Sequence, residues 1–230
     1  MLKATALAGF AARRTRVVPV AIDLSANNID LFTVAGSPVV AGDYVFTISA
    51  GVVIGSASVA TPSLSCSAFP PGSTVKLINL GTIDGRGGAG GTGGSVFWGG
   101  PNNDSPYYTP GGGGGPGGDA ISLGFDITID NANGRIAGGG GGGGGGGPPL
   151  LPAAGPPSGV SYGDYGGTGA GSQGTATGNG GSLGMSGGFG AAGALSGGSG
   201  GAAGKAIACN GKTVTWLGGN DATHVKGTVS

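Results

Sequence analysis

Two uninterrupted runs of glycine, at residues 111–115 and 138–147, limit what this chain can fold into. Glycine brings no side chain to a core, and ordering each backbone residue costs about 1–2 kcal/mol of entropy. Most of the 60 glycines among the 230 residues lie between Gly81 and Gly204. Collagen is excluded because the runs are uninterrupted glycine and lack the register of one glycine in every three residues. An ordered structure in this range therefore needs cohesion from the backbone itself.

The polyglycine II conformation supplies such cohesion. It has three residues per turn and no internal hydrogen bonds, so neighbouring rods without Cβ atoms can bond to each other laterally. The run 138–147 would form a rod of about 31 Å at about 3.1 Å per residue. Prolines at 116, 148, 149, 152, 156 and 157 suit the ends of rods, where a missing N–H is harmless. A disordered glycine-rich linker is the alternative, and amide exchange over 138–147 would separate the two.

The sequence on either side of the glycine range is typical of β-structure. β-Branched and aromatic residues alternate in short runs that end at turn residues such as Gly36–Pro38 and Pro70–Gly72. Asn28 to Val34 fits either a short helix or a strand. The expected strands are Val18–Leu24, Asp43–Ser49, Val52–Ile54 and Thr74–Ile78.

The composition therefore divides the chain into four parts. These are an N-terminal anchoring segment (1–16), a β domain (17–84), a glycine-rich polyglycine II domain with variable loops (85–204) and a C-terminal β closing segment (205–230). The predicted fold class is mainly β with a glycine-rich polyglycine II helix bundle: a β-strand base, rods and exposed loops, with essentially no α-helix.

An internal repeat connects these parts. Gly118–Ile121 followed by Asp126–Ile129 resembles Gly204–Ile207 followed by Thr213–Trp216. Val75–Asn79 leading to Gly81–Gly85 resembles Ile127–Asn131 leading to Gly134–Gly138 in the same way. Units of this kind cannot bury an apolar face alone and stack on their neighbours. We expect the strands to form a common β base.

Charge and cysteine usage exclude several classes of protein. Ten Lys and Arg balance ten acidic residues, so the surplus of cations that nucleic-acid binding or a polybasic membrane contact requires is missing. No window of eighteen apolar residues predicts a membrane helix. Met1–Ala12 faintly resembles a signal peptide, but the positive charge follows it, which favours an anchoring segment. Cys66 and Cys209 fit neither a zinc site nor a disulfide framework and are expected to be small apolar residues.

Catalytic, nucleotide and metal sites find little support, and we expect neither an enzyme nor a cofactor. The lone histidine, His224, has no triad partners in evidence and is expected at a surface or an interface. Gly211–Thr213 ends like a phosphate loop, but Ala206 stands where that motif requires glycine. Gly114–Ser122 fits a calcium-binding nonapeptide once, whereas such sites occur in tandem. The candidates for a depolymerase carboxylate pair, by elimination only, are Asp104, Asp119, Asp126, Asp130 and Asp164.

Four segments resemble the glycine-rich host-recognition domains of tailed bacteriophages. They are Asp30–Pro38 with Ser49–Ser56 and Pro70–Val75 before the glycine range, and Gly204–Ser230 after it. The resemblance implies a virion adhesin at a tail tip or tail fibre that binds a bacterial surface receptor, an outer-membrane protein or a glycan, during host adsorption. It also implies contacts with other phage tail proteins and a homotrimer. The alternatives are a structural glycine-rich tail component and an ice-binding-like polyglycine protein without receptor contact.

Aromatic residues gather where glycine stops, and we expect them in loops at the ends of rods. Tyr and Trp offer a large contact area at a low entropic cost. For Phe97 and Trp98 the alternative is a small core folded back onto the rods. Arg13, Arg14 and Arg16 are the candidates for tail attachment through an acidic partner, or else belong to a solvated terminus. The predicted receptor contacts are Phe97, Trp98, Asn102, Asn103, Tyr107, Tyr108, Leu150, Leu151, Tyr162, Tyr165 and Phe189.

Overall fold

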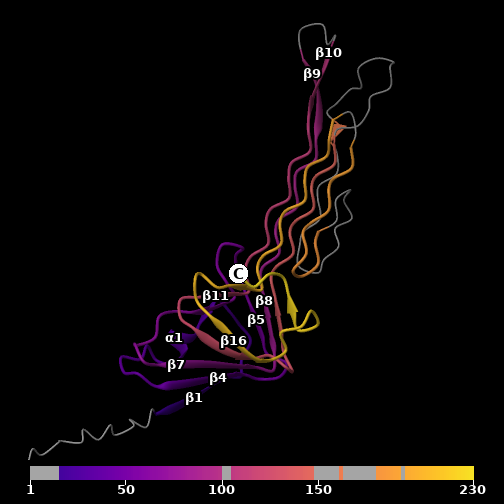
Figure 1. The fold of residues 1–230 in the computed structure, drawn as a ribbon. Coiled ribbons are helices and arrows are strands. Elements are labelled where there is room, and N and C mark those ends of the chain that lie inside the picture. The colour runs from indigo at the N-terminus through magenta and orange to yellow at the C-terminus, as the bar shows by residue number, and fades with distance from the viewer. Residues whose placement is uncertain (1–15, 100–104, 148–160, 163–179, 193–194) are drawn as a thin grey trace, which may run out of the picture.

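The computed structural model describes residues 16–99, 105–147, 161–162, 180–192 and 195–230. Figure 1 shows two parts: a broad base of β-strands and a long, narrow bundle of extended segments that projects from it. Within the described residues, α-helix is limited to the single turn α1 (Leu31–Val34), where Asp30 accepts a hydrogen bond from the N–H of Thr33. The expectation of a mainly β protein with almost no helix is confirmed.

The base consists of three sheets in which all strand pairs are parallel. Sheet A contains β1 (Val17–Ile22), β4 (Asp43–Ile48), β7 (Thr74–Asn79), β12 (Ile127–Asp130) and β16 (Val214–Gly218). Sheet B contains β2 (Ala26–Asn27), β5 (Val53–Gly55), β8 (Thr82–Asp84), β13 (Arg135–Ala137) and β17 (Val225–Lys226). Sheet C contains β3 (Ile29–Asp30), β6 (Leu64–Cys66), β11 (Ile121–Leu123) and β15 (Ile207–Ala208).

The chain visits sheets A, B and C in turn, and each circuit adds one strand to each sheet. The base is therefore a three-sided parallel β-helix, whose circuits we call coils 1 to 5 in chain order; coil 5 reaches sheet C through the bridge between Ile207 and Val229. The repeat seen in the sequence corresponds to consecutive coils, because Ile121 pairs with Ile207 and Ile127 with Val214. The expected common β base is present, and its winding into a β-helix was not predicted.

In-register stacks of apolar side chains fill the interior of the base. Alternation places every second residue of a strand inside, as for Tyr44, Phe46 and Ile48 in β4. Because the strands pair in parallel register, the inward residues of one coil lie directly above those of the next, and apolar side chains stack on apolar side chains. The main stacks are Val20–Phe46–Leu77–Ile129–Trp216 in sheet A, Ile54–Ile83–Ile136–Val225 in sheet B and Ile29–Leu64–Ile121–Ile207 in sheet C.

Both glycine-rich excursions leave the base at one corner, between sheet B and sheet C. The first runs from β8 to β11 in coil 3, and the second from β13 to β15 in coil 4. In coil 2 the short segment 56–63 spans the same corner. The expected glycine-rich range 85–204 is thus interrupted by β11, β12 and β13, which belong to the base.

The excursions contain extended segments that are neither α-helix nor β-strand, and we call them rods. Within the described residues the rods are 85–94, 111–118, 138–147, 185–191 and 197–204. Burial along rod 85–94 repeats every three residues: Gly85, Gly88, Gly91 and Gly94 are buried, and Arg86, Ala89 and Thr92 are exposed. The same period recurs in the hydrogen bonds between rods.

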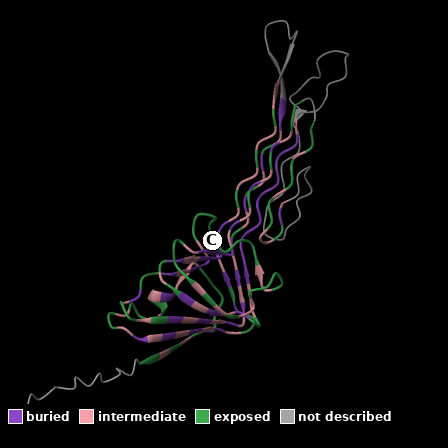
Figure 2. Ribbon diagram, viewed as in Figure 1, coloured by how far each residue is buried: buried purple, intermediate pink, exposed green. Residues whose placement is uncertain are grey.

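Rod 138–147 is the centre of the bundle, buried between the other rods (Figure 2). Its backbone bonds to all four of the other rods, with one bond per three residues to each. The N–H groups of Gly139, Gly142 and Gly145 donate to rod 111–118, and those of Gly141, Gly144 and Gly147 donate to rod 185–191. Its carbonyls accept from Gly88, Gly91 and Gly94 of rod 85–94 and from Gly198, Gly201 and Gly204 of rod 197–204. A Cβ at any of seven positions would lie against a backbone oxygen of a neighbouring segment, closer than any real contact allows, which explains the need for glycine there: Gly138, Gly139, Gly140, Gly141, Gly142, Gly144 and Gly145.

Candidate functional site

The end of the bundle farthest from the base carries a small antiparallel sheet, sheet D (Figure 1). It consists of β9 (Ser95–Gly99), β10 (Ser105–Thr109) and β14 (Ser161–Tyr162) in the order β10–β9–β14. Rod 85–94 leads into β9, and β10 leads back into rod 111–118. The hairpin is therefore a direct continuation of two rods.

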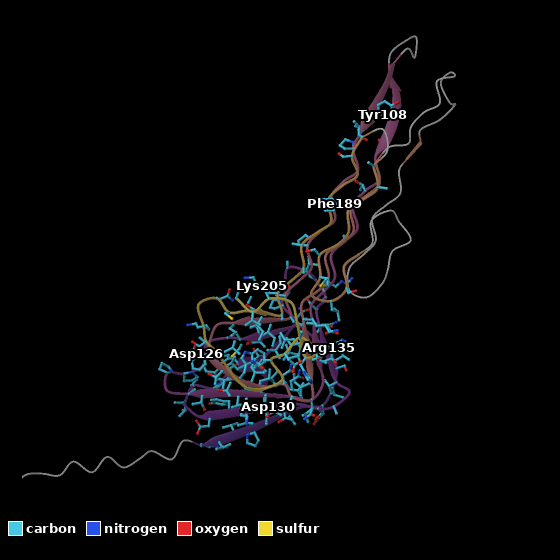
Figure 3. All side chains as sticks on the ribbon, turned by 45° about the vertical axis from the view of Figure 1, so that its right-hand side comes forward. Tyr108, Asp126, Asp130, Arg135, Phe189 and Lys205 are labelled. Atoms are coloured by element: carbon cyan, nitrogen blue, oxygen red, sulfur yellow. The ribbon has the colours of Figure 1, made fainter. Side chains whose placement is uncertain are left out.

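Sheet D brings together aromatic positions that lie far apart in the sequence. Phe97 pairs with Tyr107, Trp98 with Pro106, and Tyr108 with Val96 across the hairpin. Tyr162 pairs with Ser95 from the other side. Five of the predicted contact residues, Phe97, Trp98, Tyr107, Tyr108 and Tyr162, thus occupy one sheet at the tip. Tyr108, labelled in Figure 3, is half-buried there.

A hydroxyl pair joins the two strands of the hairpin at the point where they continue into the rods. Ser95 and Thr109, the first and last residues of the hairpin, lie opposite each other, with their side-chain oxygens 2.6 Å apart. The N–H of Ser95 also donates to Oγ1 of Thr109 at 3.0 Å. Below this pair, the N–H of Gly94 donates to the carbonyl of Gly146 in the central rod. The tip sheet is held in register with the bundle on which it stands.

The remaining predicted contacts are placed differently. Phe189 lies on rod 185–191, along the flank of the bundle in Figure 3, with 76% of its surface exposed. Phe189 was expected in a loop at the end of a rod; it instead follows a turn at Leu183–Gly184 and lies on the rod itself. Arg16 is exposed beside β1, and its carbonyl accepts from the N–H of Asp43. Asn102, Asn103, Leu150, Leu151, Tyr165, Arg13 and Arg14 lie outside the described residues.

The sequence model of the family described as "Phage tail fibre adhesin Gp38" matches residues 18–230. The chain belongs to this adhesin family. It is a virion protein of the tail fibre that binds a bacterial cell-surface receptor during host adsorption. The adhesin has no match among the curated protein sequences.

The adhesin also shares its fold with a solved structure, the "gp37-gp38 adhesin tip complex of the bacteriophage S16 long tail fiber". The TM-score is 0.53 at 24% sequence identity, and the match covers 94% of this chain and 82% of that chain. The match includes nearly all of the adhesin, so the base and the bundle together form the shared fold.

The acidic residues weighed for catalysis have structural bonds in the base. Oδ1 of Asp126 accepts from the N–H of Thr213, and Oδ1 of Asp130 from that of Ala132, both in the base in Figure 3. Oδ1 of Asp119 accepts from the N–H of Lys205 at 2.7 Å. Asp104 and Asp164 lie outside the described residues. Within the described part, no three His, Cys, Asp or Glu residues gather as a metal site would need.

The adhesin pairs His224 with Asp221 rather than with a nucleophile. The two side chains lie 2.9 Å apart in coil 5. Hydrogen bonds from His224 and from the N–H of Thr223 lower the pKa of Asp221 to about 2. Among the described residues, no helix is long and apolar enough to span a membrane.

Two polar pairs in the base were missed by the sequence reasoning. Asn79 and Asn131 are fully buried, and Nδ2 of Asn79 donates to Oδ1 of Asn131 at 2.7 Å. Arg135 donates from Nη2 to Oδ2 of Asp84 at 2.5 Å. The repeat aligning Asn79 with Asn131 could have revealed the first pair. The second joins residues two places apart along the paired strands β8 and β13, which no local pattern reveals.

Proposed function

We propose that the adhesin contacts its receptor through the tip of the bundle, with sheet D as a principal contact surface. The observation that carries this proposal is the gathering of Phe97, Trp98, Tyr107, Tyr108 and Tyr162 in one sheet at the end farthest from the base. Aromatic side chains stack on sugar faces and also fill pockets between protein loops. Asn102, Asn103, Leu150, Leu151 and Tyr165 belong to segments that adjoin this region in sequence, and they remain predicted contacts.

We further propose that the rods are polyglycine II helices. Three observations support this: the three-residue period of burial, the same period in the hydrogen bonds, and the absence of α-helix and β-strand from these segments. A bundle of this kind has no hydrophobic core to disturb. Loops at its end can then change in sequence without destabilising their support.

For attachment to the fibre we propose coil 1 of the base. Figure 1 shows β1 at the end of the base opposite the tip. β1 is an edge strand, and Val17 and Leu24 of this coil are largely exposed. An edge strand offers unpaired backbone groups to a partner. The related structure contains a gp38 adhesin in complex with gp37, and we infer an equivalent tail-fibre partner here. Arg13, Arg14 and Arg16 would add charge at this contact.

We propose that the adhesin acts by binding, without catalysis. We also propose that it is a homotrimer, and sedimentation of the purified protein tests this state. The lateral hydrogen bonds of the rods described above form within one chain. The bundle itself therefore does not require a trimer. A thermal hysteresis measurement tests the ice-binding alternative.

The test of the tip is competition for adsorption. Purified adhesin is added to host cells, and its ability to block phage adsorption is compared between the wild type and the Tyr107→Ala/Tyr108→Ala variant. Loss of aromatic anchors at a contact costs about 2 kcal/mol or more, so the half-inhibitory concentration should rise about thirtyfold. Val39→Ala, at a residue 90% exposed in the base, is the control. Phe189→Ala tests the flank separately. Unchanged inhibition by the tyrosine variant would refute the proposal for the hairpin.

A further inference from the structure

The four points where the rods join the base are tied to one another by polar contacts. Rod 85–94 begins after Asp84 at the end of β8, and rod 138–147 begins after Ala137 at the end of β13. Rod 111–118 ends before Asp119, and rod 197–204 ends before Lys205. Figure 3 shows Arg135 and Lys205 on the part of the base from which the bundle rises.

Each contact either joins the two glycine-rich excursions to each other or joins the start of one excursion to its end. Arg135, beside the root of rod 138–147, donates to Asp84 at the root of rod 85–94 at 2.5 Å. Oδ1 of Asp119 accepts from the N–H of Lys205 at 2.7 Å and so joins the two returning rods.

Ser63, which is fully buried, connects the start and end of the first excursion. Its Oγ donates to the carbonyl of Asp84 at 2.5 Å, and its N–H donates to the carbonyl of Asp119 at 3.4 Å. Ser63 belongs to segment 56–63, which spans this corner in coil 2. Oγ of Ser56 lies 2.6 Å from the carbonyl oxygens of both Ser58 and Thr61 within the same segment, and its one proton is available to either. The segment is thus a hydrogen-bonded support beneath the rods.

We propose that Asp84, Arg135, Ser63 and Asp119 form a root clamp that sets the direction of the bundle relative to the base. In this role they are positioning residues for the receptor-binding tip. The inference rests on the proposed function of the tip, but the clamp itself is a property of the rods and the base.

The energetics of the Asp84–Arg135 pair favour a positional role over a stabilising one. Burial raises the pKa of the Asp84 carboxyl even though the Arg135 guanidinium and the Lys226 ammonium lower it. Oδ1 of Asp84 and Nε of Arg135 are buried without a hydrogen-bond partner among the described residues. An ion pair with such an uncompensated burial cost adds little to folding stability. Its geometric consequence, the coupling of two rod roots, is unaffected by that cost.

Because the rods are long, a small change in their direction at the root displaces the tip by a large distance. A ten-residue rod spans about 31 Å, so a tilt of about 10° at its root moves its end by about 5 Å. Separation by even about 1 Å forfeits much of the dispersion energy of a packed contact. A clamp at the root therefore matters for binding by a distant tip.

The experiment compares two double variants of the full chain, Asp84→Ala/Arg135→Ala and, as the matched control, Asp221→Ala/His224→Ala. Each removes one bonded pair of polar side chains from the base, and only the first joins the starting points of two rods. The measurements are the melting temperature, amide exchange at Gly85, Gly88 and Gly139 near the roots, and competition for phage adsorption.

We expect the Asp84/Arg135 variant to melt within a few degrees of the wild type, while its root amides exchange about tenfold faster and its half-inhibitory concentration rises about tenfold. The control should change neither exchange nor inhibition. Equal exchange in both double variants would overturn the clamp. Should the Asp84/Arg135 variant fail to fold, stability would be the main role of this pair and the proposal would be overturned.

Ser63→Ala provides an independent test, because it should accelerate exchange at Gly85. Failure of the wild-type adhesin to compete would refute the proposed function instead, and the exchange measurement would still decide the clamp.

Discussion

A single methyl group at the centre of the bundle should destabilise it severely. A Cβ at Gly142 would lie against the carbonyl group of Ala89 in rod 85–94, closer than any real contact allows. The atoms of rod 85–94 that this Cβ would meet belong to the backbone, so rotating a side chain cannot relieve the clash. The φ angle of Gly142 is outside the left-handed region, which leaves close approach as the reason for glycine. Rod 85–94 must then move away from the central rod.

The cost follows from the hydrogen bonds on either side of the clash. The N–H of Gly88 donates to Gly140 and that of Gly91 donates to Gly143, each at 2.8 Å. Losing both bonds and leaving their buried groups unpaired costs roughly 3–6 kcal/mol. The lower chain entropy of unfolded alanine returns only about 0.4–1 kcal/mol. We expect Gly142→Ala to destabilise the bundle by about 2–5 kcal/mol.

The matched control is Gly113→Ala on rod 111–118. Gly113 is exposed, and a Cβ there would meet the side-chain oxygen of Ser199 at 3.3 Å, which a rotation of that serine relieves. Its effect should be about 1 kcal/mol or less. Denaturant unfolding gives the free-energy changes, and amide exchange at Gly88, Gly91 and Gly145 locates them in the bundle. Equal stability of the two variants would refute the argument that backbone contact requires glycine in the central rod.

Three further outcomes test the base. Asn131→Ala should cost about 2–4 kcal/mol of unfolding free energy, because it removes three hydrogen bonds of this buried side chain, one each to Asn79 and to the carbonyls of Gly219 and His224. Asn133→Ala at the surface should be near neutral. Burial raises the pKa of the Cys66 thiol to about 12, so at pH 8 a thiol reagent should modify Cys209 and reach Cys66 only after unfolding; rapid reaction of both in the native state would contradict this. The hydrogen bonds of Asp221 should make its carboxyl titrate near pH 2 in an NMR titration, and a midpoint near pH 4 would contradict the pairing. Because this pKa lies below the ordinary value of 3.8, the stabilisation from Asp221, which salt screens, is present above about pH 4 and is lost as the pH falls towards 2.

The strands of the base could be predicted because alternation is a local signal. Asp43–Ser49 and Thr74–Ile78 were expected as strands and correspond to β4 and β7. The β-helix could not be predicted in the same way, since β2, β3 and β15 have two residues each and their pairing depends on distant coils. The repeat showed which segments are equivalent. It did not show that equivalent segments lie side by side in parallel.

For the candidate site, the position of the aromatic residues next to the glycine runs predicted that they lie at the ends of rods. They were expected in loops, whereas five of them lie on the strands of sheet D, whose pairing depends on the rods. Tyr162 reaches Ser95 because the second excursion returns to the tip beside the first. Phe189 was expected in a terminal loop because bulky residues interrupt glycine there. The structure places it on a rod, since only the inward positions of an outer rod require glycine; Gly187 and Gly190 occupy them, and the exposed position between accepts an aromatic ring.

The two parts of the adhesin therefore solve the problem of register in opposite ways. In the base, side chains specify which strands align, because a slip of one residue would turn Phe46 and Leu77 outward. In the bundle, the lack of side chains permits contact, and glycine alone would allow neighbouring rods to slide by three residues without a change of pattern. Something outside the rods must fix their register. At the tip, the Ser95–Thr109 pair aligns rod 85–94 with rod 111–118. At the roots, the rods continue from strands whose register is set in the base, where β8 pairs with β13 and β11 with β15. The bonds of Asp84 and Asp119 lie at these same points, so the residues that bound the glycine segments are the ones that can determine how those segments align.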